Sequence, residues 1–393
     1  MDPIRNPYAP GAGSRPPALT GRDAEVEAFN LLLQRLLLGR AEKSMIITGL
    51  RGVGKTVLLN MFEGMAEDAG FRVATTEVTH ETEFKPLMAR MVRRILLSID
   101  PLERMKRAAL RAAGILKAFS VTLPDGASLG LDVEPLAGKA DSGELGEDLS
   151  DLFVALGAAA QERLLGVVFL MDEIQFLGRP ELESLIAALH RVAQRGLPVT
   201  LVGAGLPQLP ALVGTAKSYA ERLFNFPSIG RLDDASARAA IEKPAEEEGV
   251  TFEPEATAQI VAFTEGYPYF LQEFAKHVWN LADGPLIELR HVQEARPLVQ
   301  LQLDENFFRV RIGRVSTAEL QYLAAMADLG TGPYKSGEVA AKLGRSGPQQ
   351  VAPLRARLIN KGLIYSPGHG LSEFTVPQFD DFMRRTYPLQ GAE

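Results

Sequence analysis

The most informative residues of this chain form a short segment with the composition of a phosphate-binding loop. Residues 49–56 follow the pattern G-x-x-x-x-G-K-[ST], in which glycines let backbone N–H groups turn inward toward phosphate oxygens. In such a loop the lysine, here Lys55, reaches the β- and γ-phosphates, and the hydroxyl of Thr56 helps to hold Mg²⁺. The sequence therefore predicts ATP or ADP with Mg²⁺ as ligands, and the expected contact residues are Gly49, Gly52, Val53, Gly54, Lys55, Thr56 and Val57.

Two adjacent carboxylates, Asp172 and Glu173, follow the apolar run 167–171. Five consecutive apolar residues are typical of a strand buried on both faces, so the carboxylates would emerge at the carboxyl edge of a parallel sheet, where ligands bind. We expect Asp172 to hold Mg²⁺ and Glu173 to polarise the water that attacks the terminal phosphate. The alternative is an acid pair that only caps the next helix. Together with a phosphate-binding loop, the pair favours hydrolysis over binding alone.

The elements that must position these residues alternate between strands and helices. Because a helix follows the loop directly, its N-terminus would point at the bound anion. Strands that alternate with helices favour a parallel sheet with crossover helices, so we expect an α/β fold with a P-loop ATPase core. The expected strands are residues 44–48, 71–79, 167–171, 198–202 and 223–229.

An irregular segment separates the second and third of these strands. One long helix is expected over residues 83–116. Alternating apolar residues around a Pro-Asp-Gly turn then predict an exposed β-hairpin near 118–134. Because this insertion contains Asp125 and Asp132, we expect it to contact protein rather than DNA.

From Asp233 onward the pattern becomes all-helical and then ends in a small mixed unit. Helices are expected at 234–248, 254–264, 269–281 and 291–309, which predicts a helical lid over the core. Three further helices and two short strands, the last at 372–376, have the order of a winged helix–turn–helix. The expected divisions are an N-terminal extension (1–19), a core (20–230), a lid (231–312) and a winged helix–turn–helix (313–393).

Composition excludes several classes of protein. The absence of cysteine excludes disulfides, Cys-ligated zinc and thiol catalysis, and the five histidines lack metal-ligand spacing. No apolar run is long enough to span a bilayer, and residues 1–17 lack the apolar core of a signal peptide, so we expect a cytoplasmic protein without membrane contact. A net charge of −7 argues against a broadly basic surface but allows a local basic patch.

In the order of its motifs, the chain resembles the AAA+ ATPases, specifically their origin-recognition-complex-like branch and the neighbouring STAND signalling ATPases. The segment Gly-Arg-Asp-Ala-Glu that contains Arg22 looks like the family's G-R-x-x-E box, which implies that Arg22 lies near the adenine. Pro268 ends a Gly-Tyr-Pro segment similar to the STAND G-x-P motif, whose proline packs near the base. Arg222 stands where the family carries the arginine finger that completes a neighbour's site, which implies catalysis through self-association. The alternative for Arg222 is a surface arginine paired with Glu221.

Two departures from the family pattern predict slow turnover. The fourth strand ends in Val-Gly-Ala-Gly, which lacks the polar side chain that the family uses to position a water. The origin-recognition branch also places an arginine soon after the lid turn, whereas none occurs here before Arg290. We therefore expect a nucleotide-dependent switch rather than a motor.

The C-terminal unit has the charge pattern of a DNA-binding module. Between Glu338 and Glu373 there are five Lys or Arg residues and no acid. The third helix of this unit would present Gln349, Gln350 and Arg357 to a groove of double-stranded DNA. The leading hypothesis is an ATP-dependent DNA-binding switch, and the alternative is a STAND-like signalling or scaffold ATPase whose C-terminal domain binds a protein partner.

Overall fold

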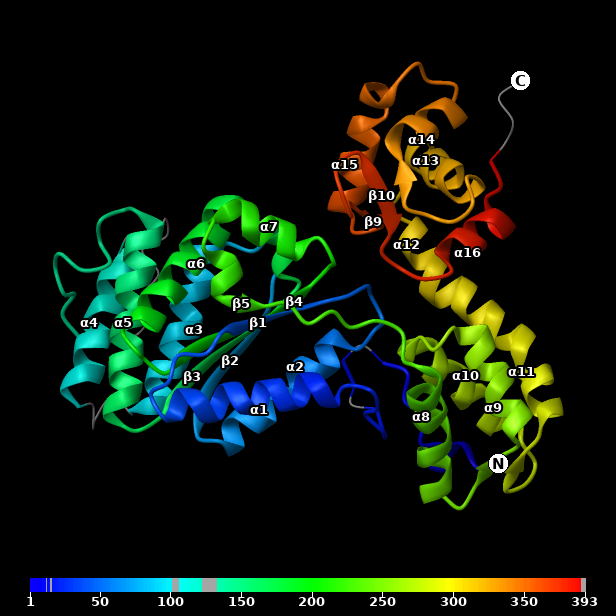
Figure 1. The fold of residues 1–393 in the computed structure, drawn as a ribbon, viewed down its shortest axis with the longest axis horizontal. Helices are drawn as coiled ribbons and strands as arrows, with labels where there is room; N and C mark the ends of the chain where they lie inside the picture. The colour runs from blue at the N-terminus through cyan, green and yellow to red at the C-terminus, as the bar shows by residue number, and fades with distance from the viewer. Residues whose placement is uncertain (12, 15, 101–105, 122–132, 390–393) are drawn as a thin grey trace.

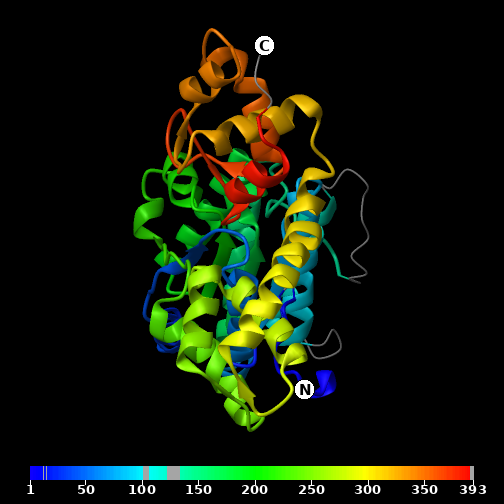
Figure 2. The same ribbon diagram turned by 90° about the vertical axis from the view of Figure 1, so that its right-hand side faces the viewer.

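The computed structural model describes residues 1–389 except 12, 15, 101–105 and 122–132. Figure 1 shows three regions: a sheet with its covering helices, an all-helical region that begins at α8 (Asp234–Glu247), and a C-terminal unit that begins at α13 (Thr317–Asp328). In Figure 2 a long helical segment, drawn in yellow, joins the all-helical region to the C-terminal unit. None of the helices in the described part of the chain has the length and apolar character needed to cross a membrane.

The first region is built on a five-stranded parallel sheet. The strands β1, β3 and β4 are buried along their whole length, as expected for strands covered on both faces. The predicted α/β architecture with a parallel-sheet core is therefore confirmed. In the order β2-β3-β4-β1-β5, the strands are β2 (Phe71–Glu77), β3 (Gly166–Asp172), β4 (Val199–Gly205), β1 (Ser44–Thr48) and β5 (Phe224–Asn225).

Side-chain alternation along β1 separates the two faces of this sheet. Met45 and Ile47 belong to the apolar cluster that includes α1 (Asp23–Leu37) and α2 (Lys55–Asp68). Ile46 belongs to the cluster on the opposite face. Helices on both faces hold the carboxyl ends of β1, β3 and β4 side by side at one edge. The helices of the second face are α3 (Phe84–Ile99), α4 (Arg107–Val121), α5 (Leu145–Glu162), α6 (Arg179–Gln194) and α7 (Leu209–Ala216).

The segment between β2 and β3 differs from the sequence prediction. The single helix expected over 83–116 is wrong, because Asp100 adopts an extended conformation that ends α3. A residue before proline, here Pro101, disfavours the helical region. The start of the expected hairpin is also wrong, because α4 continues to Val121 and buries Phe119 with Leu116 and Ala112 at helical spacing. The rest of that hairpin prediction, residues 122–132, lies outside the described residues.

The all-helical region follows the order predicted for the lid. Its helices are α8, α9 (Pro254–Thr264), α10 (Pro268–Leu281) and α11 (Leu289–Gln302), followed by a π-helical segment (Leu303–Arg309) and α12 (Val310–Ile312). Two short strands, β6 (Thr251–Phe252) and β7 (Leu286–Ile287), pair beside them. The N-terminal segment packs on this region: Tyr8 is buried and its hydroxyl donates to the Ile241 carbonyl, and Trp279 Nε1 donates to the Asp2 carbonyl at 3.0 Å.

The C-terminal unit combines helices with a small antiparallel sheet, which is compatible with the predicted outline. The third helix of the unit is α15 (Ala352–Asn360), which has Pro353 in its first turn, the position in a helix that suits a proline. A short 3-10 turn (Pro348–Gln350) precedes it. The remaining elements are α13, α14 (Ser336–Lys342), α16 (Phe379–Thr386), β8 (Tyr334–Lys335), β9 (Ile364–Tyr365) and β10 (Leu371–Phe374), with β10 central in the sheet.

Candidate nucleotide site

The phosphate-binding loop joins β1 to α2, as its pattern predicts. Gly52 and Gly54 adopt left-handed conformations, with φ of 84° and 95°, and Gly54 is the N-cap of α2. A side chain at Gly49 would collide with the core, since a Cβ there would lie 2.3 Å from the Ile229 carbonyl oxygen. The N–H of Gly49 donates to the Gly205 carbonyl at 3.1 Å, which ties the loop to the end of β4. The loop is thus held so that the N-terminus of α2 faces its interior.

Lys55 is buried at the base of this loop. Its Nζ donates to the carbonyl oxygens of Gly49 at 2.9 Å and Leu50 at 2.8 Å. Burial lowers the pKa of its ammonium group, while the carboxylates of Glu173 and Asp172 act in the opposite direction. The Lys55 ammonium group is therefore held inside the loop, close to Asp172 and Glu173, and all three side chains could act on the same bound triphosphate.

Thr56 and Asp172 come together from α2 and the end of β3. Thr56 Oγ1 donates to Asp172 Oδ2 at 2.6 Å. Burial raises the pKa of Asp172, against the opposing effect of this hydrogen bond. A hydroxyl beside a carboxylate fits Mg²⁺, which takes few protein ligands and completes its shell with phosphate and water oxygens. Within the described residues, no group of three or more His, Cys, Asp or Glu side chains could hold a metal ion alone. Thr56 and Asp172 therefore fit the predicted Mg²⁺ site when a triphosphate supplies further oxygens.

Glu173 lies next to this pair in a left-handed conformation, with φ of 54°. Its Oε2 accepts a hydrogen bond from Gln175 Nε2 and lies 4.0 Å from Arg51 Nη2. Gln175 Oε1 in turn accepts the N–H of Leu206 at 3.2 Å. A left-handed backbone is costly for a residue with a Cβ, so the hydrogen bonds around Glu173 hold it in an unusual but defined position.

Gln175 is a site residue that the sequence prediction missed. It lies in the 3-10 turn Ile174–Phe176 and contacts the end of β4, where the prediction found no polar side chain. A Cβ at Gly205 would lie 2.1 Å from Gln175 Oε1, so the glycine makes space for the amide. In the sequence, only the Gly-Ala-Gly end of β4 indicates that a side chain could fit there. That the side chain is Gln175 is known only from the fold.

A cavity of about 640 Å³ connects the loop to the lid and to the N-terminal segment. It brings together all of the nucleotide contacts predicted from the sequence except Gly49. It also contains two arginines that the prediction did not include, Arg51 of the loop and Arg311 of α12. The residues from the lid are Leu232, Ala240, Pro268, Tyr269, Gln272, Asn306, Phe307 and Arg311.

Arg22 borders the same cavity, but its guanidinium is bound to backbone. It donates to the carbonyl oxygens of Gly21 at 2.9 Å, Val53 at 3.2 Å and Gly230 at 2.6 Å. Burial lowers its pKa, and Glu25 and Asp233 oppose that shift. Arg22 therefore braces the phosphate loop, and its contact with an adenine stays a prediction.

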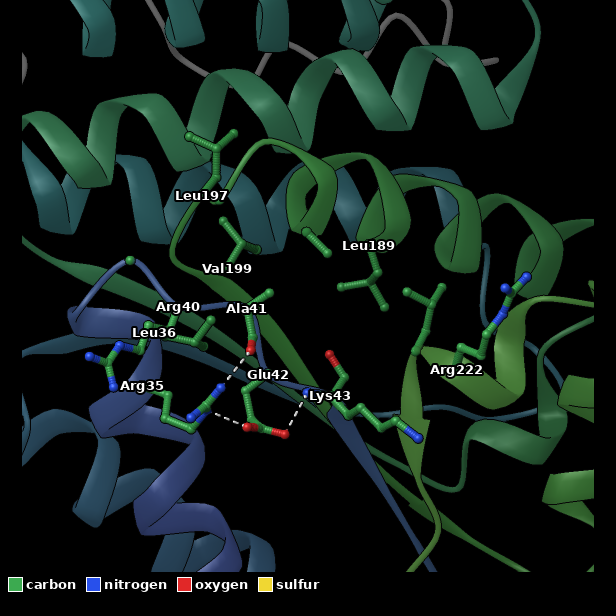
Figure 3. Close-up of a pocket in the computed structure, with 15 residues that line it drawn as sticks. Arg35, Leu36, Arg40, Ala41, Glu42, Lys43, Leu189, Leu197, Val199 and Arg222 are labelled. Carbon is green, nitrogen blue, oxygen red and sulfur yellow. Dashed lines mark hydrogen bonds and ion pairs between the residues drawn. The ribbon is translucent and has the colours of Figure 1, made fainter.

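Arg222 lies at the opposite edge of the sheet from Lys55. It ends the 3-10 turn Ala220–Arg222 and borders a second pocket of about 350 Å³, drawn in Figure 3. That pocket includes Ser44 and Val199, the first residues of β1 and β4, whereas Lys55 follows the carboxyl end of β1. Arg222 is therefore remote from its own chain's phosphate loop, and its predicted role needs a second subunit. In the described chain, no ion pair joins it to Glu221.

The residues predicted to face DNA differ in their availability. Gln349 and Gln350 are exposed. Arg357 is not free as expected, because its Nε donates to Oε1 of the buried Glu319 at 3.0 Å. The prediction overlooked this pair because Glu319 belongs to α13, outside the acid-free stretch of sequence.

The other four cations of that stretch are mostly paired as well. Lys361 Nζ lies 2.7 Å from the second oxygen of Glu319, and Lys342 pairs with Asp328. Arg355 donates to the hydroxyls of Ser372 and Ser366 and to the Leu371 carbonyl. Of the five, Arg345 alone has no side-chain hydrogen bond or ion pair within the described residues.

The C-terminal unit touches the phosphate loop directly. The N–H of Arg51 donates to the Thr375 carbonyl at 3.0 Å. A Cβ at Gly362 would lie 2.8 Å from Arg51 Nη2, and His80 Nε2 is hydrogen-bonded to the Asn360 carbonyl. A residue that lines the nucleotide cavity is therefore in contact with the ends of β10 and α15.

Comparison with known proteins relates this site to known ATPases. Residues 18–202 match the family described as AAA ATPase domain, and residues 305–383 match a domain of unknown function (DUF8462). No curated protein matches the sequence.

Several solved structures are similar to almost the whole chain. The Walker-type ATPase PABY2304 of Pyrococcus abyssi has a TM-score of 0.54 and 15% identity, over 94% of this chain and 97% of that one. The Aeropyrum pernix ORC1 protein, solved in complex with DNA, has a TM-score of 0.43 and 17% identity, over 94% and 93% of the two chains. The RuvB Holliday junction branch migration motor of Thermotoga maritima has a TM-score of 0.46 and 16% identity, over 93% and 95%. At these identities the likeness to PABY2304 supports the fold alone.

Proposed function

Because residues 18–202 match the AAA ATPase domain family, we propose that this protein is a slow, Mg²⁺-dependent ATPase that acts as a nucleotide-dependent switch. The hydrogen bond from the Arg51 N–H to the Thr375 carbonyl carries this proposal. It joins the phosphate loop to the C-terminal unit. A change in the loop's conformation on nucleotide binding would therefore be transmitted directly to that unit.

The residues of the cavity have distinct roles in the proposed reaction. The loop amides and Lys55 bind the phosphates, and Thr56 and Asp172 hold Mg²⁺, which would neutralise charge on the phosphate oxygens. Glu173 orients and polarises the attacking water. Its hydrogen bond from Gln175 and its proximity to Arg51 stabilise the carboxylate in place. A restrained base supports slow turnover.

The charge distribution of the C-terminal unit favours a protein partner over DNA as the output of the switch. Affinity for DNA depends on cations that can neutralise phosphates. Of the five cations expected to do so, Lys342, Arg357 and Lys361 pair with acids, and Arg355 is bound within the unit. We therefore place a signalling or scaffold ATPase first. In it Arg222 would complete a neighbour's site on self-association in the cytoplasm.

Binding of double-stranded DNA is the second candidate. The exposed Gln349 and Gln350 and the unpaired side chain of Arg345 favour it, because all three lie in the short segment between α14 and α15. Both proposals include the winged helix–turn–helix assignment. Both also include the four divisions of the sequence, which are 1–19, 20–230, 231–312 and 313–393.

Two measurements on the same protein test the proposal and separate the candidates. Fluorescence anisotropy with duplex DNA, in MgATP and in MgADP, should show weak binding that does not depend on the nucleotide. Tight, salt-sensitive binding that differs between the nucleotides would instead establish the DNA candidate.

Light scattering should show assembly that depends on ATP in the wild type. Lys55→Ala should lose nucleotide affinity by about 100-fold, because a charge-assisted contact is removed, and should not assemble. Hydrolysis by Lys55→Ala at the wild-type rate would contradict the ATPase assignment.

A further inference from the structure

The two helices that follow β2 each carry a pair of exposed arginines. They are Arg90 and Arg94 on α3, and Arg107 and Arg111 on α4. The two helices pack against each other on the second face of the sheet. Because α3 ends at Ile99 and α4 begins at Arg107, Arg94 and Arg107 lie near the junction, and Arg90 and Arg111 lie about one turn further from it. We term these four residues the arginine surface.

The arginine surface has no acid of its own to neutralise it. Neither α3 nor α4 contains Asp or Glu. Within the described residues, none of the four arginines has a side-chain hydrogen bond or an ion pair. The acids near the start of α4 have other partners: Asp100 is bound to Arg163, and Glu162 accepts the N–H of Ala108 at 3.4 Å. The four charges are therefore available to a partner.

The spacing of the four arginines is unfavourable within each helix. In both pairs two cations are four residues apart, where like charges repel each other and destabilise a helix. Other arginines of the chain have an acid at this spacing instead, as Arg179 has Glu183 and Arg238 has Asp234. Two uncompensated pairs on adjacent helices favour a role for these arginines outside the fold.

Leu110 indicates which class of anion suits the arginine surface. Its side chain is 49% exposed and lies between Arg107 and Arg111 in the sequence of α4. A protein can offer apolar side chains to this leucine as well as carboxylates to the arginines. Cations that bind nucleic acids mostly contact phosphate and sugar, which offer Leu110 no apolar partner. The combination favours a protein.

We propose that the arginine surface docks an acidic segment of a partner protein, in which carboxylates are interspersed with apolar residues. A planar guanidinium can bind both oxygens of one carboxylate. The chain as a whole has a net charge of −7, so this surface is a local exception that would steer an acidic partner toward it. In Figure 1, α4 lies at the end of the first region that is remote from the lid and the C-terminal unit. Docking there leaves the C-terminal unit free, and it does not depend on the ATPase activity proposed above.

Fluorescence anisotropy with a labelled peptide of four Glu-Glu-Leu repeats tests this assignment on the whole chain. The wild type should bind the peptide, and the affinity should fall at least about 10-fold between about 50 and 300 mM NaCl. The combined variant Arg90→Gln, Arg94→Gln, Arg107→Gln and Arg111→Gln should weaken binding by about 10- to 100-fold, because each exposed charge pair contributes a small part of the affinity.

The matched control makes the same change in net charge at exposed arginines that already have acidic partners. It replaces Arg5, Arg179, Arg290 and Arg309 with Gln and should bind the peptide as the wild type does. Leu110→Ser should weaken binding of the Glu-Glu-Leu peptide by about two- to fivefold, and should leave binding of a Glu-Glu-Ser peptide unchanged, because only the apolar contact is lost.

Equal losses in the two fourfold variants, or no binding of the peptide by the wild type, would overturn the docking site. Tighter binding of a short DNA duplex than of the peptide, lost in the arginine-surface variant, would assign the surface to nucleic acid instead. Self-association of the wild type at low salt that this variant lacks would assign it to a second copy of the chain. If the fourfold variant has a lowered melting temperature, the two double variants, one on each helix, decide: each should account for part of the loss.

Discussion

The nucleotide cavity and the C-terminal unit use the same residue types in opposite ways. In the C-terminal unit, Arg357 and Lys361 converge on one buried carboxylate, Glu319. In the cavity, Arg51 and Arg311 keep buried Nε donors without partners in the described chain. A cation whose charge is balanced within the protein contributes to structure. Arg311 has no ion pair with a carboxylate in the described chain and Arg51 has only a 4.0 Å contact with Glu173, so the guanidinium groups at the cavity wall are available to a ligand.

The buried carboxylates of the two regions show the same difference. Burial raises the pKa of Asp172, and the nearby hydrogen bonds and Lys55 do not reverse that shift. Burial also acts to raise the pKa of Glu319, but hydrogen bonds from Lys361, Ser316 and Arg357 lower it to about 2. Asp172 thus lacks the positive charge that Mg²⁺ would supply, whereas Glu319 already has two cations. Sequence alone cannot separate the two, because the cations that pair with Glu319 lie about 40 residues away along the chain.

The largest expected effect separates chemistry from stability in the cavity. Glu173→Gln should slow ATP hydrolysis by about 100- to 10,000-fold, since a general base is removed, while nucleotide affinity and melting temperature stay near wild type. Steady-state phosphate release and calorimetry measure the two quantities. The control Glu183→Gln alters a half-buried acid that lies outside the cavity and pairs with the exposed Arg179, and it should change neither quantity. Hydrolysis at the wild-type rate by Glu173→Gln would show that Glu173 is not the general base.

The corresponding change in the C-terminal unit should affect stability and leave chemistry nearly unchanged. Glu319→Gln removes the carboxylate that Arg357 and Lys361 share, but both cations are more than one-third exposed and can be rehydrated, so the loss in the free energy of unfolding should be about 1 to 2 kcal/mol. Chemical denaturation followed by circular dichroism measures this loss. Glu338→Gln, which alters an exposed acid paired with Lys335 in the same unit, should cost less than about 0.5 kcal/mol. Equal costs for the two variants would contradict a structural role for Glu319.

The pKa of Glu319 predicts how the stability of the C-terminal unit depends on pH. Its folded pKa of about 2 is below the ordinary value of 4.5. The stabilisation by Glu319 is therefore present above pH 4.5 and is lost as the pH falls from 4.5 toward 2. In Glu319→Gln this part of the acid-induced loss should disappear, which a denaturation series between these pH values would show.

The smallest expected effect lies at the boundary between the two regions. Gly362 and Gly370 have similar positive φ, 67° and 71°, so an alanine at either site causes similar backbone strain. A Cβ at Gly362 would meet Arg51 Nη2 at 2.8 Å, whereas one at Gly370 would meet nothing within 4 Å. Gly362→Ala should displace the Arg51 guanidinium from Glu173 and change the ATPase rate by about two- to fivefold, the value of a weak ion pair. Identical rates for Gly362→Ala and Gly370→Ala would show that this contact does not influence the site.

Local patterns were sufficient for much of the fold and for part of the site. The loop at 49–56 and the strand before Asp172 have periodicities and residue types that depend on few neighbours, and both occur as predicted. The break after Ile99 was missed, because the prediction gave no weight to Pro101, which disfavours a helical Asp100. The continuation of α4 to Val121 was missed, because alternating apolar residues suit both a strand and one face of a helix over so short a stretch. Gln175, Arg51 and Arg311 were missed for a different reason: no spacing in the sequence relates them to Glu173.

By itself, therefore, the sequence determined the phosphate loop, the acids that follow the buried strand, and the alternation that predicts a parallel sheet. Each of these depends on stereochemistry within a few residues, such as the left-handed glycines at 52 and 54. Only the tertiary structure decided which charges are neutralised. It paired Arg357 with Glu319, placed Arg222 at the far edge of the sheet, and brought Arg311 to the cavity. The electrostatic state of a charged side chain depends on burial and on partners distant in the sequence, and the folded chain alone supplies both.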